Sequence, residues 1–235
     1  MTLYQLYLES GPLHKKTMVH ILDLLGCIAR GPTTEDALAG TPDAIRVYLR
    51  FLQRHGEAVK PEEEIQTKVA EHITEGTWLG NGDPELLFQP DLKPLSTKEL
   101  EIYIRHLEWS RADIQELVSG LSDVEVEAKP SAGRPIKAIL EHIFGAEYSY
   151  MQPFGKLDGI RGPAFNTPRS KDELLKWMGV LRAGELQKLR SLSSKQLSEP
   201  FARGKYTRTT RRILRRMLEH EWEHLVELQE RLATG

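Results

Sequence analysis

The sequence has a single cysteine, Cys27, which rules out an intramolecular disulfide and a thiolate metal cluster and is typical of a reducing compartment. It has no apolar run near the ~20 residues that cross a bilayer, and its start, MTLYQLYLES, lacks the basic-then-apolar layout of a secretion signal. It also lacks a strong charge of either sign: a net charge of -2 gives no reason to expect nucleic acid or an anionic membrane as the partner. These absences predict a cytoplasmic protein without a membrane segment.

What is present is the composition of an ordinary globular protein, with 40% apolar and 28% charged residues. At roughly 100–200 residues per domain, the chain is long enough for two small domains or one large one. Residues 76–95 concentrate Gly, Pro, Asn and Asp without a hydrophobic period, which is typical of a linker, here one that packs along a domain. We therefore expect two domains, 1–92 including the linker and 93–235.

Short extended stretches open the first segment. Three of them mix β-branched and aromatic residues with polar ones and end at turn residues: 2–9, 16–22 and 26–30. A further stretch places Ile65, Val69 and Ile73 four residues apart, which fits one face of a strand or of a short helix, and we favour the strand. The segment is therefore expected to contribute three or four antiparallel strands.

One long helix is expected between these strands. Thr33 or Thr34 can cap it, acidic residues follow in its first turn, and Gly56 is a suitable stop. Pro42 lies inside this span and would kink the helix or mark a second start, because an interior proline costs about 3 kcal/mol. The first domain is therefore predicted to be a small α+β domain with one helix on a face of its sheet.

The run HILDLLGCIARGPTTEDALAGTPDAIRVYL resembles HicB-type antitoxin domains. Their signature is a strand, an Asp-Leu-Pro-Gly-Cys turn, a second strand and a Gly-x-Thr-x-Glu-Glu-Ala start to a helix. The matching residues are Asp23, Leu24, Gly26, Cys27, Gly31, Thr33, Glu35 and Ala37, with Leu25 in place of the usual proline. The resemblance covers about residues 2–56 and implies a ferredoxin-like or RNase-H-remnant sheet that serves as a binding module without catalysis.

The second segment has the pattern of four helices. Each has one apolar stripe, and they cover about residues 97–121, 134–152, 171–189 and 207–230. Ser96 and Glu99 form a capping box at the start of the first helix, and the Gly- and Pro-rich residues 154–168 are typical of a long crossover loop. The short link after the first helix and the long loop after the second predict an all-α, up-down-down-up four-helix bundle.

Three histidines fall on the apolar stripes of this bundle. His220 and His224 are four residues apart, so they lie on one helix face one turn apart, and His142 lies in the stripe of the second helix. Polar residues in such seams are costly unless they are paired or ligated. Three neutral imidazoles suit Zn²⁺, Ni²⁺ or Fe²⁺ and leave one position open for water or substrate. Ordinary core or surface histidines are the alternative, since H-x-x-x-H arises by chance in many helices.

The stretches RPIKAILEHIFGAEYSYM and RRILRRMLEHEWEHL resemble the second and fourth helices of the DinB/YfiT-like superfamily. That family pairs a His-x-x-x-Ala-Glu-type helix with a His-x-x-x-His helix around a divalent metal. His142, with Ala146 and Glu147 after it, matches the first motif, and His220 and His224 match the second. The resemblance covers most of residues 97–232 and implies one divalent ion, zinc first, with nickel, iron or manganese as alternatives. Characterised members include bacillithiol- or mycothiol-dependent transferases and isomerases and amidohydrolase-like enzymes.

Two arginines are further candidates for the site. Arg111 interrupts the stripe of the first helix and either lines a substrate cavity or extends to solvent. Arg216 lies one turn before His220 and is a candidate for holding an anionic group of the substrate. Three glutamates could orient imidazoles, or simply form a solvated face: Glu147, Glu219 and Glu223. No catalytic residue is assigned.

These observations predict a metal-dependent enzyme of the thiol-transferase or hydrolase kind that acts on a small molecule, with a low-molecular-weight thiol as one candidate substrate. The alternative is a non-catalytic, antitoxin-like binding or regulatory module with a structural metal. Nucleic-acid binding would rest only on the arginines of the last helix, and the near-neutral charge disfavours it. No membrane partner is expected, and a homodimer is left open.

Overall fold

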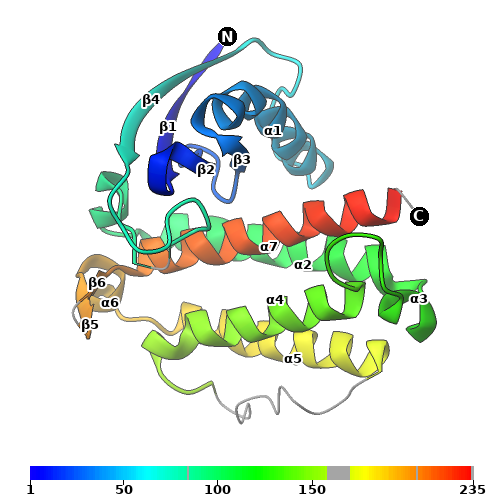
Figure 1. The fold of residues 1–235 in the computed structure, drawn as a ribbon. Helices are drawn as coiled ribbons and strands as arrows, with labels where there is room; N and C mark the ends of the chain where they lie inside the picture. The colour runs from blue at the N-terminus through cyan, green and yellow to red at the C-terminus, as the bar shows by residue number, and fades with distance from the viewer. Residues whose placement is uncertain (84, 158–169, 205, 234–235) are drawn as a thin grey trace. The chain divides into compact units, whose positions relative to one another are not determined.

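The computed structural model describes residues 1–83, 85–157, 170–204 and 206–233, which Figure 1 traces along the chain. The protein consists of two compact units. The first comprises residues 1–94 and 200–219, and the second comprises residues 95–199 and 220–235. The sequence suggested one division, near residue 92, whereas the chain changes unit after residues 94, 199 and 219.

A four-stranded sheet with the strand order β3-β2-β1-β4 forms the centre of the first unit. Its strands are β1 (Thr2–Ser10), β2 (Lys15–His20), β3 (Ile28–Thr33) and β4 (Ile65–Ile73). The β1–β2 and β2–β3 pairs are antiparallel, but β4 runs parallel to β1. Three antiparallel strands are present as expected, and the expectation that a fourth strand would also be antiparallel is wrong. The helix between β3 and β4 brings the chain back to the end of the sheet from which β1 starts. β4 can therefore run in the same direction as β1, and a crossover connection of this kind is what parallel pairing requires.

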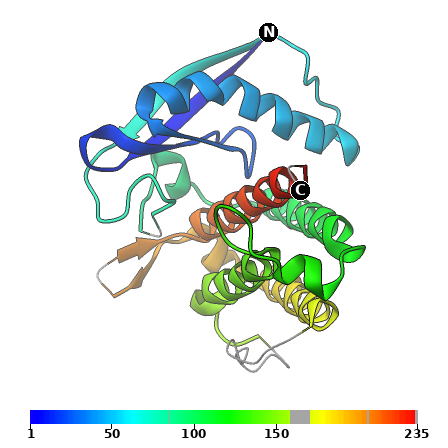
Figure 2. The same cartoon turned by 45° about the vertical axis from the view of Figure 1, so that its right-hand side comes forward.

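Helix α1 (Thr34–Arg54) lies along one face of this sheet, as Figures 1 and 2 show from two directions. Its N-terminus is capped by the Thr33 hydroxyl, which accepts the backbone N–H of Asp36 at 3.1 Å. The helix continues through Pro42 without a second start. The buried apolar residues of α1 are Ala37, Ile45, Tyr48, Leu49, Phe51 and Leu52. Their burial supplies the hydrophobic contact that holds the helix on the sheet.

The segment that follows β4 belongs to the first unit and packs within it. Leu79, Leu86 and Phe88 form a buried cluster, and partly buried Tyr7 and Ile73 of the sheet pack against it. A short 3-10 helix, η2 (Gln89–Leu92), ends this segment. The residues predicted to form a linker therefore contribute core to the first unit up to residue 94.

The second unit is a bundle of helices: α2 (Thr97–Ser119), α4 (Ile136–Met151), α5 (Lys171–Arg190) and the second half of α7 (Thr210–Ala233). The predicted capping box opens α2, with the Ser96 N–H donating to Glu99 at 2.9 Å and the Glu99 N–H donating to Ser96 at 3.2 Å. Two short helices, α3 (Asp123–Glu127) and α6 (Ser194–Ser198), were not predicted. Within the described residues, no helix combines the length and apolar composition needed to cross a membrane.

Two small strands, β5 (Phe201–Arg203) and β6 (Tyr206–Arg208), precede α7 and pair antiparallel in the first unit. They too were absent from the sequence prediction, because three-residue strands carry too little periodicity to be recognised. Most of the predicted crossover loop at 154–168 falls outside the described residues. The up-down-down-up order of the bundle stays a prediction.

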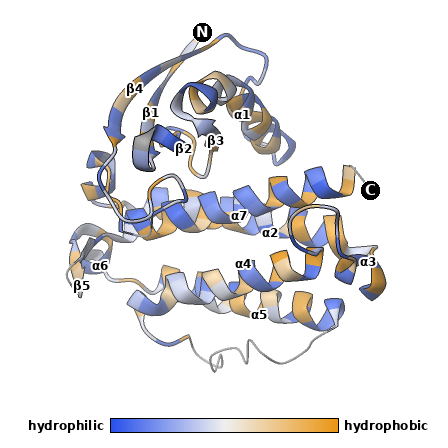
Figure 3. Cartoon of the chain, viewed as in Figure 1, coloured by the Kyte–Doolittle hydropathy of each residue, from blue (hydrophilic) through white to orange (hydrophobic). Residues whose placement is uncertain are grey.

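Helix α7 is buried at every position from Arg212 to Trp222, although Figure 3 shows the helix coloured largely as hydrophilic. The sequence predicted one apolar stripe opposite a polar face. The polar face is not solvated, because its charges form buried ion pairs within each unit. In the first unit, Arg215 donates to both carboxylate oxygens of Asp91 at 2.9 Å and to Glu219 at 3.0 Å. Ion pairs of this kind tolerate burial because each charge has several polar partners.

Candidate metal centre

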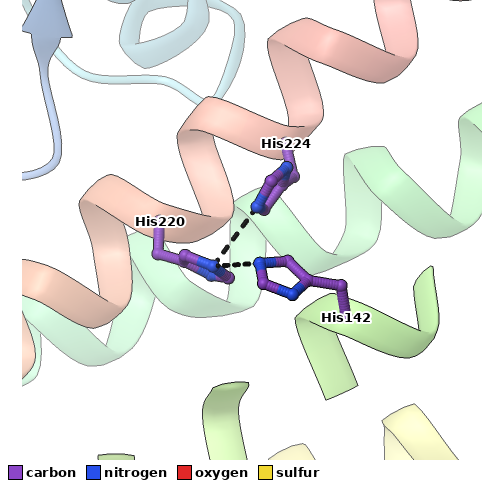
Figure 4. A group of neighbouring side chains, drawn as sticks. All are labelled: His142, His220 and His224. Atoms are coloured by element: carbon purple, nitrogen blue, oxygen red, sulfur yellow. Dashed lines mark hydrogen bonds between the residues drawn. The ribbon is translucent and has the colours of Figure 1, made fainter. Parts of the chain in front are cut away.

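Helices α4 and α7 bring three histidines together in the second unit, as Figure 4 shows. Nε2 of His220 lies 2.9 Å from Nε2 of His142 and 3.2 Å from Nε2 of His224. One ring nitrogen of each histidine lies within 4.8 Å of the other two. Elsewhere in the described part of the chain, no group of three His, Cys, Asp or Glu residues meets this spacing. The three candidate ligands named from the sequence therefore lie at one place.

The separations between these nitrogens suit a shared cation. A Zn–N bond of about 2.0–2.1 Å places two nitrogens of a tetrahedral site about 3.3 Å apart, close to the observed 2.9 and 3.2 Å. A proton on Nε2 of His220 can form a hydrogen bond to only one of the two neighbouring rings. A cation between the rings can accept a lone pair from all three. The donor set therefore fits a divalent metal ion.

The cluster is closed on the α7 side and accessible on the α4 side. His220 and His224 are 6% and 3% exposed, whereas His142 lies at the surface. Partial burial, together with the charges of His224 and Arg134, lowers the pKa of His142 to about 4. The His142 ring is therefore neutral at neutral pH, with a lone pair available for a ligand bond. The ring of Tyr150, two turns further along α4, meets the ring of His220 edge-on, with 5.9 Å between centroids.

The far side of His224 faces an ion pair that the sequence did not reveal. Oε2 of Glu227 lies 2.7 Å from Nδ1 of His224, and Nη2 of Arg134 lies 3.3 Å from that oxygen and 3.2 Å from that nitrogen. The hydrogen bond with His224, assisted by Arg134, lowers the pKa of Glu227 to about 2, so this carboxylate is ionised. The available signal was the spacing of three residues between His224 and Glu227, which places both side chains on one helix face.

Arg111, expected to line a substrate cavity or extend to solvent, does not extend to solvent. The residue is 3% exposed, and its guanidinium lies in an ionic cluster to which α2, α4, α5 and α7 all contribute. Its Nε donates to Glu221 at 2.9 Å, its Nη1 donates to the carbonyl oxygen of Met178 at 2.9 Å, and its Nη2 lies 2.5 Å from Glu147. Arg182 pairs with the same two glutamates. These contacts assign Arg111 a structural place in the bundle.

Glu185 completes this ionic cluster, which we define as Arg111, Glu147, Arg182, Glu185 and Glu221. Its Oε2 accepts a hydrogen bond from Arg182 at 3.0 Å. Burial and the negative charge of Glu147 raise the pKa of Glu185 to about 8. Burial would raise the pKa of Glu147 as well, but Arg111 and Arg182 lower it overall. With Glu185 protonated, two carboxylates face two guanidinium groups, and the ionic cluster is neutral.

Arg216 and Glu219 belong to the half of α7 that lies in the first unit. Arg216 is 4% exposed, and its Nε donates to the carbonyl oxygen of Gly82 at 3.3 Å. Glu219, one of the three glutamates considered for orienting the imidazoles, instead lies 2.8 Å from Nδ1 of His20. Burial would raise the pKa of Glu219, but Arg215 and His20 lower it to about 2. These contacts offer no support for an anion-binding role of Arg216 beside the histidines.

Comparisons with known proteins cover part of the chain. A family model for the DinB superfamily matches residues 106–228, more than half of the chain. Among solved structures, the chain is similar to YfiT from Bacillus subtilis, a probable metal-dependent hydrolase with an unusual four-helix bundle topology. That similarity has a TM-score of 0.46 and 16% sequence identity, and it covers 59% of this chain and 90% of YfiT. No curated protein matches the chain. The family match begins at residue 106, so the HicB-type resemblance of the first unit stays a prediction.

Proposed function

This chain belongs to the DinB superfamily, and we propose that its three-histidine cluster binds one divalent metal ion and that the loaded protein is an enzyme. The ligands are His142, His220 and His224, and the reaction is a hydrolysis or a thiol transfer on a small molecule. The observation that supports this proposal is the convergence of three imidazole nitrogens from two helices, with separations of 2.9 and 3.2 Å.

Three protein ligands are the number typical of catalytic zinc sites, which keep one position for water or substrate. When bound there, a divalent ion supplies Lewis-acid activation of a water or thiol nucleophile near neutral pH. An all-imidazole donor set suits zinc, with nickel and iron as alternatives, better than manganese, which prefers oxygen ligands. The neutral ring of His142 provides the exposed edge of the cluster, where a small molecule can approach.

Metal analysis of tag-free, full-length protein tests the ligand assignment. One equivalent of metal per chain is expected for the wild type, and His142→Ala, His220→Ala and His224→Ala are each expected to lower that content. His55→Ala, at the end of α1 in the first unit, is a histidine control that should keep the wild-type content. If the His220→Ala and His224→Ala proteins both retain a full equivalent, the proposed site is wrong.

X-ray absorption on the zinc-loaded protein separates the enzyme from the alternative of a regulatory module with a structural metal. The enzyme is expected to show three imidazoles and one oxygen that added azide replaces. Four protein ligands, with no response to azide, would favour the structural metal. Ester and amide hydrolysis and thiol addition to an electrophile can then be assayed with and without chelator, and the activity found should disappear in His142→Ala.

A further inference from the structure

The side of His224 that faces away from the other two histidines is occupied by the carboxylate of Glu227. Nδ1 of His224 lies 2.7 Å from Oε2 of Glu227, while Nε2 of the same ring lies 3.2 Å from Nε2 of His220. We propose that Glu227 is the positioning residue of the metal centre: it accepts a hydrogen bond from Nδ1–H of His224 and thereby keeps the lone pair of Nε2 free for the ion. This inference rests on the proposed function, because it assigns a role toward the ion that His224 would bind.

The contact with Glu227 determines which nitrogen of the His224 imidazole carries the proton. A neutral imidazole carries one proton, and a carboxylate can only accept it. Nδ1 of His224 has two polar neighbours, Oε2 of Glu227 at 2.7 Å and Nη2 of Arg134 at 3.2 Å, and the shorter contact is a hydrogen bond when Nδ1 carries the proton. The lone pair of His224 is then on Nε2, the nitrogen that faces His220. A carboxylate behind a ligating histidine also fixes the orientation of the ring and increases its basicity. Glu227 therefore selects both the tautomer and the direction of the lone pair.

Glu227 is itself held in place by Arg134, which precedes α4. Nη2 of Arg134 donates to Oε2 of Glu227 at 3.3 Å, and the backbone carbonyl of Arg134 accepts a hydrogen bond from Arg231 at 2.9 Å. The preceding residue, Gly133, has φ +79, and a Cβ there would lie 2.6 Å from Nη2 of Arg231. Hydrogen bonds with Glu227 and Arg231 thus join the turn before α4 to α7. The same turn leads into the helix that carries His142.

An ordinary surface ion pair does not account for this arrangement. The side chains of Arg134 and Glu227 are 34% and 31% exposed, but the His224 side chain between them and the cluster is 4% exposed. If the His224 ring turned by half a turn about its Cβ–Cγ bond, a carbon atom would replace Nδ1 beside Glu227 and the 2.7 Å hydrogen bond would be lost. This contact therefore favours one of the two ring orientations. The arrangement therefore places the second nitrogen of His224 at the cluster before any ion arrives.

Two measurements on the full-length chain test the role of Glu227. Nitrogen-15 NMR of metal-free protein reports which nitrogen of His224 carries the proton, with His224→Ala used to assign its signals. Competition with a chromophoric zinc chelator reports the dissociation constant of the zinc complex. The variants are Glu227→Ala, Glu227→Gln, which keeps an acceptor oxygen, and Glu116→Gln, an exposed α2 residue of the same unit that serves as the control.

The wild type and the control are expected to show His224 protonated on Nδ1. Glu227→Ala should move the proton largely to Nε2 and weaken zinc binding by about 10- to 100-fold, and Glu227→Gln should restore most of both properties. An unchanged tautomer in Glu227→Ala, or zinc affinity within twofold of the wild type, overturns the inference. If the wild type binds none of zinc, nickel and iron, the proposed function fails, yet the tautomer measurement still decides whether Glu227 keeps the proton of His224 on Nδ1.

Discussion

The Nε2 atoms of His142 and His220 lie 2.9 Å apart, although the two residues are separated by 78 positions in the chain. The pair forms only when α4 and α7 are packed together, because each helix supplies one ring. An ion that joins these nitrogens therefore binds the folded chain and has far less affinity for the unfolded one. Metal binding and folding of the second unit are thereby linked.

Zinc is accordingly expected to raise the thermal stability of the wild type. At a free concentration 100 times its dissociation constant, a ligand that binds only the folded state adds about 2.7 kcal/mol. For a chain of this size that corresponds to roughly 5–10 °C in Tm. Differential scanning fluorimetry with and without zinc measures the shift. His220→Ala should show almost none, and an equal shift in that variant would place the zinc elsewhere.

Arg182→Met is expected to destabilise the protein by about 3–5 kcal/mol. It leaves Arg111 as the one guanidinium beside the buried carboxylates of Glu147 and Glu221, so one negative charge of the ionic cluster is uncompensated. The matched control lies two turns later on α5. Arg190 pairs with Glu101 at 3.3 Å, but these side chains are 49% and 45% exposed, so Arg190→Met should change stability by less than about 1 kcal/mol. Urea unfolding of both variants measures the difference. Equal losses would mean that the ionic cluster contributes no more than a surface pair.

Glu185 gives the protein a stability that falls as the pH rises. Its pKa is raised from 4.5 to about 8 in the folded chain, so the folded state holds this proton more tightly than the unfolded state. Its contribution is complete below pH 4.5 and is lost progressively as the pH increases toward 8. Glu185→Gln, which cannot ionise, should remove a slope of up to about 1.4 kcal/mol per pH unit. Urea unfolding of both proteins from pH 5 to pH 8 tests this, and parallel curves would contradict it.

Replacing two glycines of the first unit by alanine should change the stability of the protein in opposite directions. Gly80 has φ +78, and a Cβ there would lie 1.9 Å from the carbonyl oxygen of Lys16, so Gly80→Ala should destabilise by more than about 1 kcal/mol. Gly40 lies inside α1 with open space around it, so Gly40→Ala should stabilise by about 0.5–1 kcal/mol. Thermal unfolding of the two variants gives the signs. A loss of stability in Gly40→Ala would show that the α1 surface is more crowded than the structure indicates.

The parts of the fold that sequence predicted well are those with local causes. The start of α2 followed from Ser96 and Glu99, three residues apart. The start of α1 was placed at Thr33 or Thr34, and Thr33 is the cap. The parallel pairing of β4 with β1 could not be predicted in this way, because it depends on which strand edge is open after α1 has crossed the sheet. The burial of α7 was hidden for a similar reason. The partner of Arg215 is Asp91, which lies 124 positions earlier in the chain. The hydrophobic period of a helix carries no information about so distant a partner.

In the candidate site, too, the residues that could be predicted are those with a local sequence pattern. His142, His220 and His224 could be named because helical spacing places them on apolar stripes and because their motifs resemble those of a known family. Glu227 could not be separated from other helix glutamates, since most of them are simply solvated. The ionic cluster was missed because the partners of Arg111 come from three other helices.

The division of α7 between Glu219 and His220 limits how this protein can be dissected or recombined. A fragment beginning at residue 95 would retain all three histidines but lose Asp91, which holds Arg215, and the carbonyl oxygens of Asp83 and Leu86, which hold Arg212. Two buried guanidinium groups would lose those partners. The second unit therefore cannot be moved to another protein by itself. A gene fusion that replaces residues 1–94 must also supply acceptors for Arg212 and Arg215.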